Sequence, residues 1–288
     1  MTTMKTSAAI FVAALLVIPC AGNVPDASAQ APATQAPPTQ APSEPYQPRV
    51  GQPGKDVVWV PSPEEMVERA LDLAAVTPKD FVIDLGSGDG RNVISAAKRG
   101  AQALGVEFNA DLVQLSKQYA AKAGVADKAT FVQGDMFEVD ISKATVMALF
   151  LLPDNLKRLR QKLFDLRPGT RIVANTFGIE GWKPDEQKTY EDGCTSWCTV
   201  MLWIVPAKID GSWRLPSGDL KLTQEFQNFS GTLGSATVEN GHLRGEEITF
   251  SVGGAQYSGR VNGNAMNGSV KKPDGTESKW SASRAGAE

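Results

Sequence analysis

The sequence lacks an excess of either charge. Its 29 lysines and arginines stand against 32 aspartates and glutamates, which gives a formal net charge of −3. A surface that binds nucleic acid, or a polybasic patch that binds an anionic membrane, requires a clear excess of basic residues. We therefore expect no nucleic-acid partner and no electrostatic attachment to a membrane.

Histidine and cysteine are scarce. His242 is the one histidine, and the three cysteines are Cys20, Cys194 and Cys198. A structural zinc site takes about four cysteine or histidine ligands, and His242 stands far from the cysteines in the sequence. We therefore expect no metal site, and chemistry that depends on a histidine base is disfavoured.

Long apolar runs are lacking as well. The run from Ala8 to Ile18 is too short to cross a membrane as a helix. Lys5 precedes this run, and Ala27-Ser28-Ala29 offers a cleavage site between small residues. This pattern is typical of a secretory signal peptide, here residues 1–29. We expect an exported, periplasmic protein with no membrane span in its mature form.

Export from the cytosol would affect the state of the three cysteines, and the segment after the predicted signal peptide has its own composition. Cys20 resembles the lipidated cysteine of lipoproteins, but Pro19 stands where a small residue is expected, which disfavours a lipid anchor. Residues 30–50 are rich in Pro, Ala and Gln and predict a disordered linker. If Cys20 leaves with the signal peptide, Cys194 and Cys198 remain in an oxidising compartment, where we expect a disulfide rather than two buried free thiols.

The most informative stretch is FVIDLGSGDGRNVISAAKRGAQALGVE, residues 81–107. The apolar run at 81–85 predicts a strand buried on both faces. A glycine-rich turn follows, then a helix over 92–98 and a second strand over 103–106 that ends at Glu107. Glycines allow the backbone torsions and the close ligand approach that such a turn requires, although an ordinary βα connection can also be rich in glycine. An acid at the tip of the second strand can bind a ribose diol.

The glycine spacing distinguishes two ligand classes. The dinucleotide-binding pattern is G-x-G-x-x-G, but here Arg91 stands in place of the third glycine. Asp84 precedes the first glycine and Asp89 lies within the turn. Carboxylates in these positions would repel a pyrophosphate and would favour a ligand with a cationic amino-acid end.

Strands alternate with helices over much of the chain, which predicts right-handed crossovers and a doubly wound, mostly parallel α/β sheet. We assign this Rossmann-like domain to residues 51–209. The predicted helices are 64–75, 111–123 and 155–166, and the later strands are 129–133, 145–152, 171–176 and 198–206. The last strand is expected to complete the sheet edge in antiparallel fashion, after a polar loop over 179–193. Ligands of such sheets bind at the carboxyl ends of the strands, where Gly86, Glu107 and Asp135 all fall, although Asp135 could also be an ordinary loop residue.

Two features flank this core. Ser62 is the expected N-cap of the first helix, with Pro63 at the first helical position and Glu65 three residues after the cap. Trp59 and Pro61, just before it, could line the ligand site or simply pack.

The C-terminal region, residues 210–288, has no helical periodicity. Short alternating runs are separated by the turn pairs Asn240-Gly241, Asn262-Gly263 and Asp274-Gly275. We expect a small antiparallel β domain in the form of a meander, sandwich or barrel.

The pattern D-x-G-x-G-x-G, followed by an acid after the next strand, resembles motif I and its successor in class I S-adenosylmethionine-dependent methyltransferases. The segments VWVPSPEEMVERALDLA, DLGSGDGRNVI, GVEFNADLV, GDMF, FLLPDNLKRLRQKLFDLRPGTRIVA and WKPD are similar to bacterial exported methyltransferase-domain proteins. This similarity extends into the β-rich end near Trp213. The DLGSGDGR segment also resembles the ATP synthase c-subunit lysine methyltransferase group.

The resemblance implies S-adenosyl-L-methionine as cofactor and assigns it a set of residues. Asp84, Gly86, Ser87, Gly88 and Gly90 would surround its methionine end. Glu107 would hold the ribose, and Asp135 would lie near the adenine together with its neighbour Met136.

The sequence differs from many methyltransferases at the residues that would contact the methyl acceptor. Many amine and base methyltransferases carry Asn or Asp followed by Pro-Pro-Tyr after the fourth strand, whereas this chain has Leu151-Leu152-Pro153. This argues against nucleobase methylation. Because transfer from a sulfonium needs alignment more than acid–base help, an amine such as a protein lysine fits best. The alternatives are an exported protein that binds the cofactor without turnover and an envelope protein whose β domain binds a partner.

Overall fold

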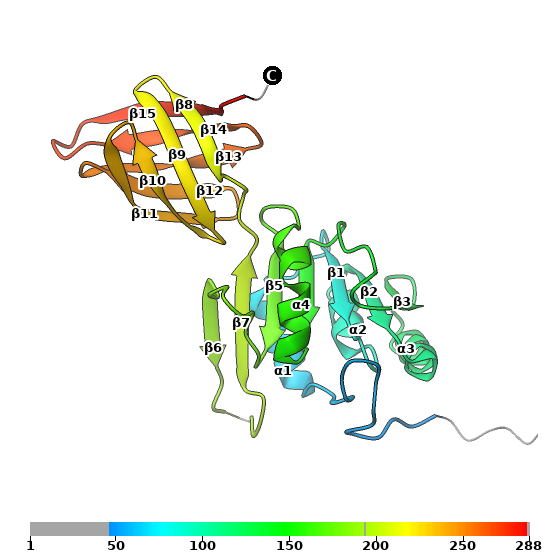
Figure 1. Cartoon of the computed structure of the whole chain (residues 1–288). Coiled ribbons are helices and arrows are strands. Elements are labelled where there is room, and N and C mark those ends of the chain that lie inside the picture. The colour runs from blue at the N-terminus through cyan, green and yellow to red at the C-terminus, as the bar shows by residue number, and fades with distance from the viewer. Residues whose placement is uncertain (1–45, 193, 287–288) are drawn as a thin grey trace, which may run out of the picture. The chain divides into compact units, whose positions relative to one another are not determined.

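The computed structural model describes residues 46–192 and 194–286. The predicted signal peptide, Gly193 and most of the predicted linker lie outside the described residues. Within the described part, no helix is long and apolar enough to cross a membrane. The described residues form a seven-stranded sheet with flanking helices and a closed eight-stranded barrel (Figure 1).

The sheet has the strand order β3-β2-β1-β4-β5-β7-β6. The five strands from β3 to β5 in this order are parallel, whereas β7 is antiparallel to β5 and to β6. The chain reverses its winding direction between β1 and β4, as in other doubly wound sheets, so the predicted α/β class is confirmed. The strands are β1 Phe81–Leu85, β2 Gln102–Glu107, β3 Ala129–Gln133, β4 Val146–Leu149, β5 Arg171–Asn175, β6 Glu186–Thr189 and β7 Thr199–Ile204.

Helices cover both faces of the sheet. They are α1 Glu64–Leu73, α2 Arg91–Lys98, α3 Ala110–Lys122 and α4 Pro153–Phe164. Apolar residues of α1, α2 and α3 share one core cluster with Val82 and Val173. Residues of α4 share a second cluster, on the opposite face, with Ile83 and Ile172. Successive residues of β1 and β5 therefore point into different clusters. Both faces of these strands are buried, which explains why their sequences are unbroken apolar runs.

The N-cap prediction for α1 is wrong. Pro63, not Ser62, is the cap residue, and its torsions of φ −55° and ψ 136° lie outside the helical region. No side chain caps the helix; the Ser62 carbonyl instead accepts a hydrogen bond from the guanidinium of Arg91. The helix therefore begins one residue later than a proline at the first helical position would imply.

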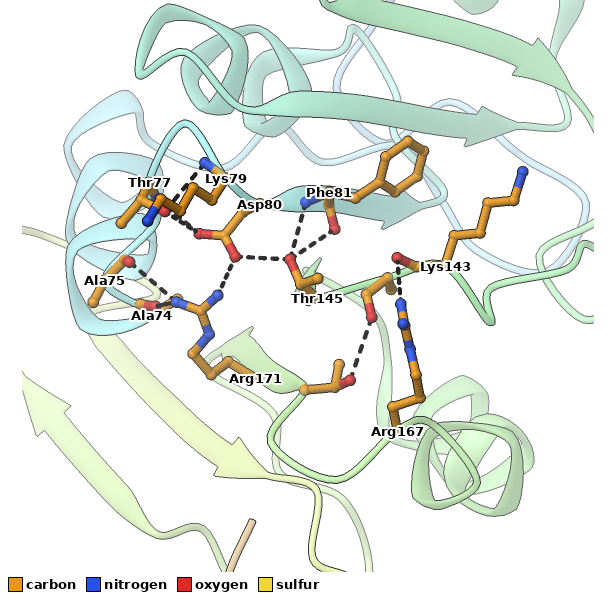
Figure 2. Close-up of polar contacts among 12 residues, drawn as sticks. Ala74, Ala75, Thr77, Lys79, Asp80, Phe81, Lys143, Thr145, Arg167 and Arg171 are labelled. Atoms are coloured by element: carbon orange, nitrogen blue, oxygen red, sulfur yellow. Dashed lines mark hydrogen bonds and ion pairs between the residues drawn. The ribbon is translucent and has the colours of Figure 1, made fainter. Parts of the chain in front are cut away.

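A partly buried ion pair joins the amino ends of the central strands (Figure 2). Asp80, directly before β1, pairs with Arg171 at the start of β5 and accepts a hydrogen bond from Thr145 Oγ1 at 2.7 Å. Arg171 also donates to the carbonyls of Ala74 and Ala75, just after α1. Burial opposes ionisation of Asp80, but hydrogen bonds from Thr145 and Thr77 and the charge of Arg171 outweigh it and lower the Asp80 pKa.

The far edge of the sheet differs from the prediction. The predicted polar loop contains strand β6, so β6 and not β7 forms the edge. The sequence of β6 is EQKT and its side chains are mostly exposed, so it carries no apolar signal. Cys194 and Cys198 are joined by a disulfide, which closes a short loop directly before β7.

The C-terminal strands form a closed antiparallel barrel in which each strand pairs with its neighbours in sequence and β15 pairs with β8. They are β8 Gly211–Leu215, β9 Gly218–Glu225, β10 Asn228–Leu233, β11 Ala236–Arg244, β12 Glu247–Val252, β13 Ala255–Asn262, β14 Ala265–Lys271 and β15 Glu277–Arg284. Of the three predicted forms, the barrel is the one observed. Its interior is filled by side chains that include Trp213, Phe250 and Trp280.

Two of the three predicted turns fall at connections between strands. Asp274-Gly275 lies in the β14–β15 connection, whereas the β13–β14 turn is one residue later than predicted, at Gly263-Asn264, because Asn262 still pairs with Ala265. The turn predicted at Asn240-Gly241 is wrong, because both residues lie inside β11, where the register shifts. Asn240 has φ 52° there. A β-bulge and a hairpin turn both favour residues that accept positive φ, so the dipeptide alone does not separate them.

Candidate functional site

A cavity opens at the carboxyl ends of β1, β2, β3 and β4, and the segment from Gln52 to Ser62 forms its other wall. The predicted site residues that line it are Asp84, Gly86, Ser87, Gly88, Glu107, Asp135 and Met136. Trp59 and Pro61 line it too, which decides between the two possibilities for these residues. Gly90 does not line the cavity.

The glycine turn exposes its backbone to the cavity. Gly86, Gly88 and Gly90 have φ of 70°, 55° and 84°, all in the left-handed region. A Cβ on Gly88 would lie 2.6 Å from Nε1 of Trp59. A Cβ on Gly90 would lie 2.6 Å from the ring of Phe131, beneath the turn. Gly88 therefore gives room on the cavity side, whereas Gly90 gives room for packing between the turn and β3.

Asp84 is the most perturbed group of the site. It is 3% exposed, and Nδ2 of Asn92 donates to its Oδ2 at 3.0 Å. Burial raises the pKa of Asp84 to about 8; the bond from Asn92 opposes this shift, and the negative charges of Glu107 and Asp89 add to it. A buried carboxyl that lines a cavity in this way gains its charge readily only when a cation lies beside it.

Glu107 is held by backbone N–H groups. Gly88 N donates to Oε2 at 3.0 Å and Asn109 N donates to Oε1 at 2.9 Å. Asn109 in turn caps α3 by accepting from Asp111 N and Leu112 N. Each carboxylate oxygen still has capacity to accept from a ligand. Sequence reasoning found Glu107 but missed Asn109, whose position before a predicted helix is the signal for a cap.

Asp135 is paired with a residue far away in the sequence. Its carboxylate accepts from Lys55 Nζ and from Phe137 N, the latter at 2.9 Å. The hydrogen bond from Lys55 and then that from Phe137 lower the pKa of Asp135. The same Lys55 ammonium lies 5.1 Å from the centre of the Phe108 ring. The segment before α1 thus meets the ends of β2 and β3 across the cavity.

Arg91 also joins this segment to the turn. Its Nε donates to Asp89 Oδ1 at 2.9 Å, and its guanidinium binds the Ser62 carbonyl. Asp89 is therefore neutralised by Arg91, and Asp84 is left as the buried acid that faces the cavity without a cationic partner among the described residues.

Beyond β4, the cavity is lined by Phe150 and Leu151. The ring of Phe150 lies 6.3 Å from that of Phe177 and 5.8 Å from that of Trp197, measured between centres. Sequence reasoning noted only the Leu151-Leu152-Pro153 segment here. It missed the aromatic residues because they come from separate parts of the chain.

The residues present fit S-adenosylmethionine. Asp84 offers a carboxyl for a cationic group, and Glu107 offers acceptor oxygens for a diol. The hydroxyl of Ser87 is buried and has no hydrogen-bond partner among the described residues, so a bound ligand can satisfy it. The absence of a side chain at Gly86 and Gly88 allows Leu151 and Trp59 to pack close to the turn, so a ligand that approaches this backbone would contact these side chains too.

Comparisons with known proteins bear on the same region. The family model described as the ANTKMT methyltransferase domain matches residues 84–186. A protein-lysine N-methyltransferase of Saccharolobus islandicus (strain REY15A) is 44% identical over 152 residues, which are 52% of this chain and 94% of that protein. A lysine N-methyltransferase of Rattus norvegicus that acts on the ATP synthase c-subunit is 35% identical over 128 residues, which are 44% of this chain and 59% of that protein.

A solved structure of an RNA methyltransferase from Salinibacter ruber, in complex with S-adenosyl-L-homocysteine, is 45% identical to this chain. The match covers 52% of this chain and 96% of the other, with a TM-score of 0.49. The chain thus spans nearly all of the S. islandicus relative but only 59% of the rat one.

Proposed function

Because the chain belongs to the class I S-adenosylmethionine-dependent methyltransferases, in the family of the S. islandicus protein-lysine N-methyltransferase, we propose that it methylates the side-chain amine of a protein lysine. The buried Asp84, which faces the cavity within the segment matched by the family model, supports the cationic cofactor. The observation that carries the lysine acceptor is the 44% identity to the S. islandicus protein-lysine N-methyltransferase. The enzymes compared above act by methyl transfer, and nothing in the comparisons favours the alternative of binding without turnover.

The proposed placement of the cofactor follows the charges and donors around the cavity. The cationic methionine end would lie beside Asp84, with the hydroxyl of Ser87 and the open backbone of Gly86 and Gly88 around it. The ribose hydroxyls would donate to Glu107. The adenine end would lie near Asp135 and Met136. The cofactor supplies a methyl group already activated by a sulfonium.

The chain's own contribution is then alignment and exclusion of water. Trp59 and Pro61 line the cavity, and Trp59 packs directly on Gly88 of the glycine turn. These side chains would help to exclude water from the reacting centre. The acceptor nitrogen has to present its lone pair in line with the bond that breaks, after it has lost its proton to solvent. Well-held reactants of this kind have effective molarities of about 10⁵ M or more, so the reaction does not require a histidine base.

The test is methyl transfer to protein acceptors. The purified protein is incubated with methyl-labelled S-adenosylmethionine and a periplasmic extract, and the labelled residues are identified by mass spectrometry. We expect label on lysine side chains, and much less label with an Asp84→Asn variant at a cofactor concentration that does not saturate it. Label found only on oxygen or sulfur acceptors would contradict the proposal, and tight cofactor binding with no transfer to any acceptor would support the binding-protein alternative.

We also propose that the protein is exported to the periplasm. The charged, apolar and small-residue pattern of residues 1–29 supports this, as does the Cys194–Cys198 disulfide, which persists in oxidising compartments. Mass analysis of the protein recovered from a periplasmic fraction tests it. A chain that begins near Gln30 is expected, whereas an uncleaved chain in the cytosol would contradict export.

The division into domains is a further proposal. Residues 51–209 would form the catalytic domain and residues 210–288 a separate β domain, in keeping with the sheet that ends at β7 and the barrel that starts at β8. Scanning calorimetry should show two unfolding transitions, of which only one moves when Trp280 in the barrel interior is replaced by Ala. A single transition that moves as a whole would contradict this division.

A further inference from the structure

Three aromatic side chains meet beside the cofactor cavity. We name Phe150, Phe177 and Trp197 the aromatic cluster. Their ring centres are 6.3 Å apart for Phe150 and Phe177, 5.8 Å for Phe150 and Trp197, and 5.7 Å for Phe177 and Trp197. The Trp197 ring is tilted by 63° and 55° to the other two, so the rings do not form a simple stack.

The position of the cluster matches that of an acceptor. Phe150 follows β4 and lines the cavity, whereas Glu107 and Asp135 follow β2 and β3 on the other side of β1. If the nucleoside end of the cofactor lies over β2 and β3, as proposed above, its methyl group points toward β4. The acceptor must then reach the methyl group past Phe150.

Trp197 is held in an unusual way. It is 38% exposed, and its φ of 62° lies in the left-handed region, which bulky residues adopt rarely and at a cost. Cys194 and Cys198, on either side of it, are joined by a disulfide. The left-handed backbone costs stability, and a partly exposed indole gains less from burial than a fully buried one, so packing alone gives little return for this cost. Its ring is, however, well placed to contact a ligand.

We propose that the aromatic cluster is the acceptor subsite and that it captures the protonated amine of an alkylammonium side chain by cation–π contact. The faces of Trp and Phe rings attract cations within about 6 Å of the ring centre. Rings this close together allow one ammonium to contact more than one of them. The exposed side of Trp197 leaves a path for the amine to lose its proton to water before it attacks.

This assignment rests on the proposed lysine methylation and makes it more specific. It predicts that charge, and not only apolar surface, decides which molecules enter. It also gives the disulfide a role, since the loop that carries Trp197 is closed by it. A lysine within a protein and a small free alkylamine present the same ammonium, and the experiment therefore includes both.

Binding is measured by calorimetry on the purified full protein saturated with S-adenosylhomocysteine, so that no turnover is required. The probes are the methylamide of N-acetyl-trimethyllysine and its neutral analogue with carbon in place of the ammonium nitrogen. The third probe is butyltrimethylammonium, which represents a small alkylammonium outside a protein. The variants are Trp197→Ala and Trp197→Phe, with Tyr119→Ala as a matched control, since Tyr119 is 43% exposed and lies outside the cluster.

The charged lysine probe should bind about 2- to 30-fold more tightly than its neutral analogue, the range expected for cation–π contact. Trp197→Ala should remove most of this preference, Trp197→Phe should keep much of it, and Tyr119→Ala should leave it unchanged. Affinity for S-adenosylhomocysteine should stay the same in all three variants. Tighter binding of the lysine probe than of butyltrimethylammonium would indicate a protein acceptor, and the reverse order would assign the subsite to small amines.

Equal binding of the charged and neutral probes would overturn the subsite, even if methyl transfer to lysine occurs. Absence of transfer to any lysine, with the charge preference intact, would overturn the proposed function but not the subsite. A Cys194→Ser/Cys198→Ser double variant should lose the charge preference as Trp197→Ala does. An unchanged preference in that variant would overturn the role given to the disulfide.

Discussion

The side-chain amide of Asn92 donates to Oδ2 of Asp84 at 3.0 Å, and through this bond the first turn of α2 holds the acid at the end of β1. Asp84 is 3% exposed, so it has given up most of its hydration. One neutral donor does not compensate a buried carboxylate. The free protein therefore keeps this group at an energetic disadvantage that a cationic ligand can relieve.

Replacement of Asp84 by Asn should stabilise the free protein in a pH-dependent manner. The pKa of Asp84 is raised from 3.8 to about 8 in the folded state. Between these values the folded chain binds a proton that the unfolded chain has released, so stability falls as the pH rises through this window. Thermal unfolding without ligand should show Asp84→Asn melting above the wild type at pH 8 and close to it near pH 4. A difference that does not change with pH would contradict the assigned pKa.

The same substitution should weaken cofactor binding. Loss of a charged hydrogen-bond partner costs about 1.5–3 kcal/mol, or about 10- to 150-fold in affinity. In the wild type, binding of S-adenosylhomocysteine at pH 7 should release close to one proton from Asp84, which calorimetry in buffers of different ionisation enthalpy detects. Asp84→Asn should release none. Equal proton release by both proteins would mean that Asp84 does not ionise on binding.

Two substitutions of Glu107 distinguish the loss of its negative charge from the loss of its acceptor oxygens. Glu107→Ala should weaken cofactor binding by about 1.5–3 kcal/mol, the cost of losing a charged acceptor. It also frees the N–H groups of Gly88 and Asn109 that the carboxylate now binds. Glu107→Gln keeps one acceptor oxygen and should lose less affinity. An unchanged dissociation constant for S-adenosylhomocysteine in the Ala variant would show that this acid does not hold the ribose.

The two glycines of the turn should respond differently to alanine. At Gly90 the new Cβ would lie 2.6 Å from the Phe131 ring and 2.9 Å from Ser116 Cβ, both in the core. Overpacking of this kind costs about 1–3 kcal/mol of stability. At Gly88 the contact is Nε1 of Trp59, at 2.6 Å, which lies on the cavity wall. Denaturant unfolding should show the larger loss for Gly90→Ala. Gly88→Ala should displace Trp59, which a change in tryptophan fluorescence detects, and should weaken cofactor binding in calorimetry.

The glycine turn also shows which features of the site the sequence predicts and which it does not. The strands buried on both faces were recognisable from their apolar runs, and β1 and β3 have the predicted bounds. Parallel topology alone then brought Glu107 and Asp135 to one cavity, because the carboxyl ends of parallel strands meet at one edge. The sequence did not distinguish the roles of Gly88 and Gly90, because these depend on Trp59 and Phe131, which are remote in the chain.

The remaining errors have the same origin. Strand β6 is short, polar and exposed, so only its pairing with β7 defines it. The partner of Asp135 is Lys55, 80 residues away, and no local sequence pattern predicts such a pair. The aromatic cluster collects residues from three separate segments. Local periodicity specifies elements, whereas contacts between distant segments specify the details of a site.

The pair of Asp80 and Arg171 predicts an acid-sensitive step in stability. Thr145 Oγ1 donates to Asp80 Oδ1 at 2.7 Å and Phe81 N donates to Thr145 Oγ1 at 2.9 Å, so the hydroxyl links the acid to β1 (Figure 2). The pKa of Asp80 lies below 3.8 despite its burial. Its contribution is therefore present above the unfolded-state pKa and is lost as the pH falls through the lower folded-state value.

Thr145→Val removes the hydroxyl and keeps the shape. The loss should be about 1.5–3 kcal/mol near pH 7, because the bond is made to a charged group. It should shrink as the pH falls through the lowered folded-state pKa of Asp80, where the wild type loses the charge as well. The control is Thr170→Val, whose hydroxyl donates to the neutral carbonyl of Ala144 at 3.3 Å. Its smaller loss, about 0.5–1.5 kcal/mol, should not vary with pH. Denaturant unfolding of both variants between pH 3 and pH 7 measures the contrast. Equal and pH-independent losses would mean that Thr145 acts only as packing and that Arg171 and Thr77 hold the charge of Asp80.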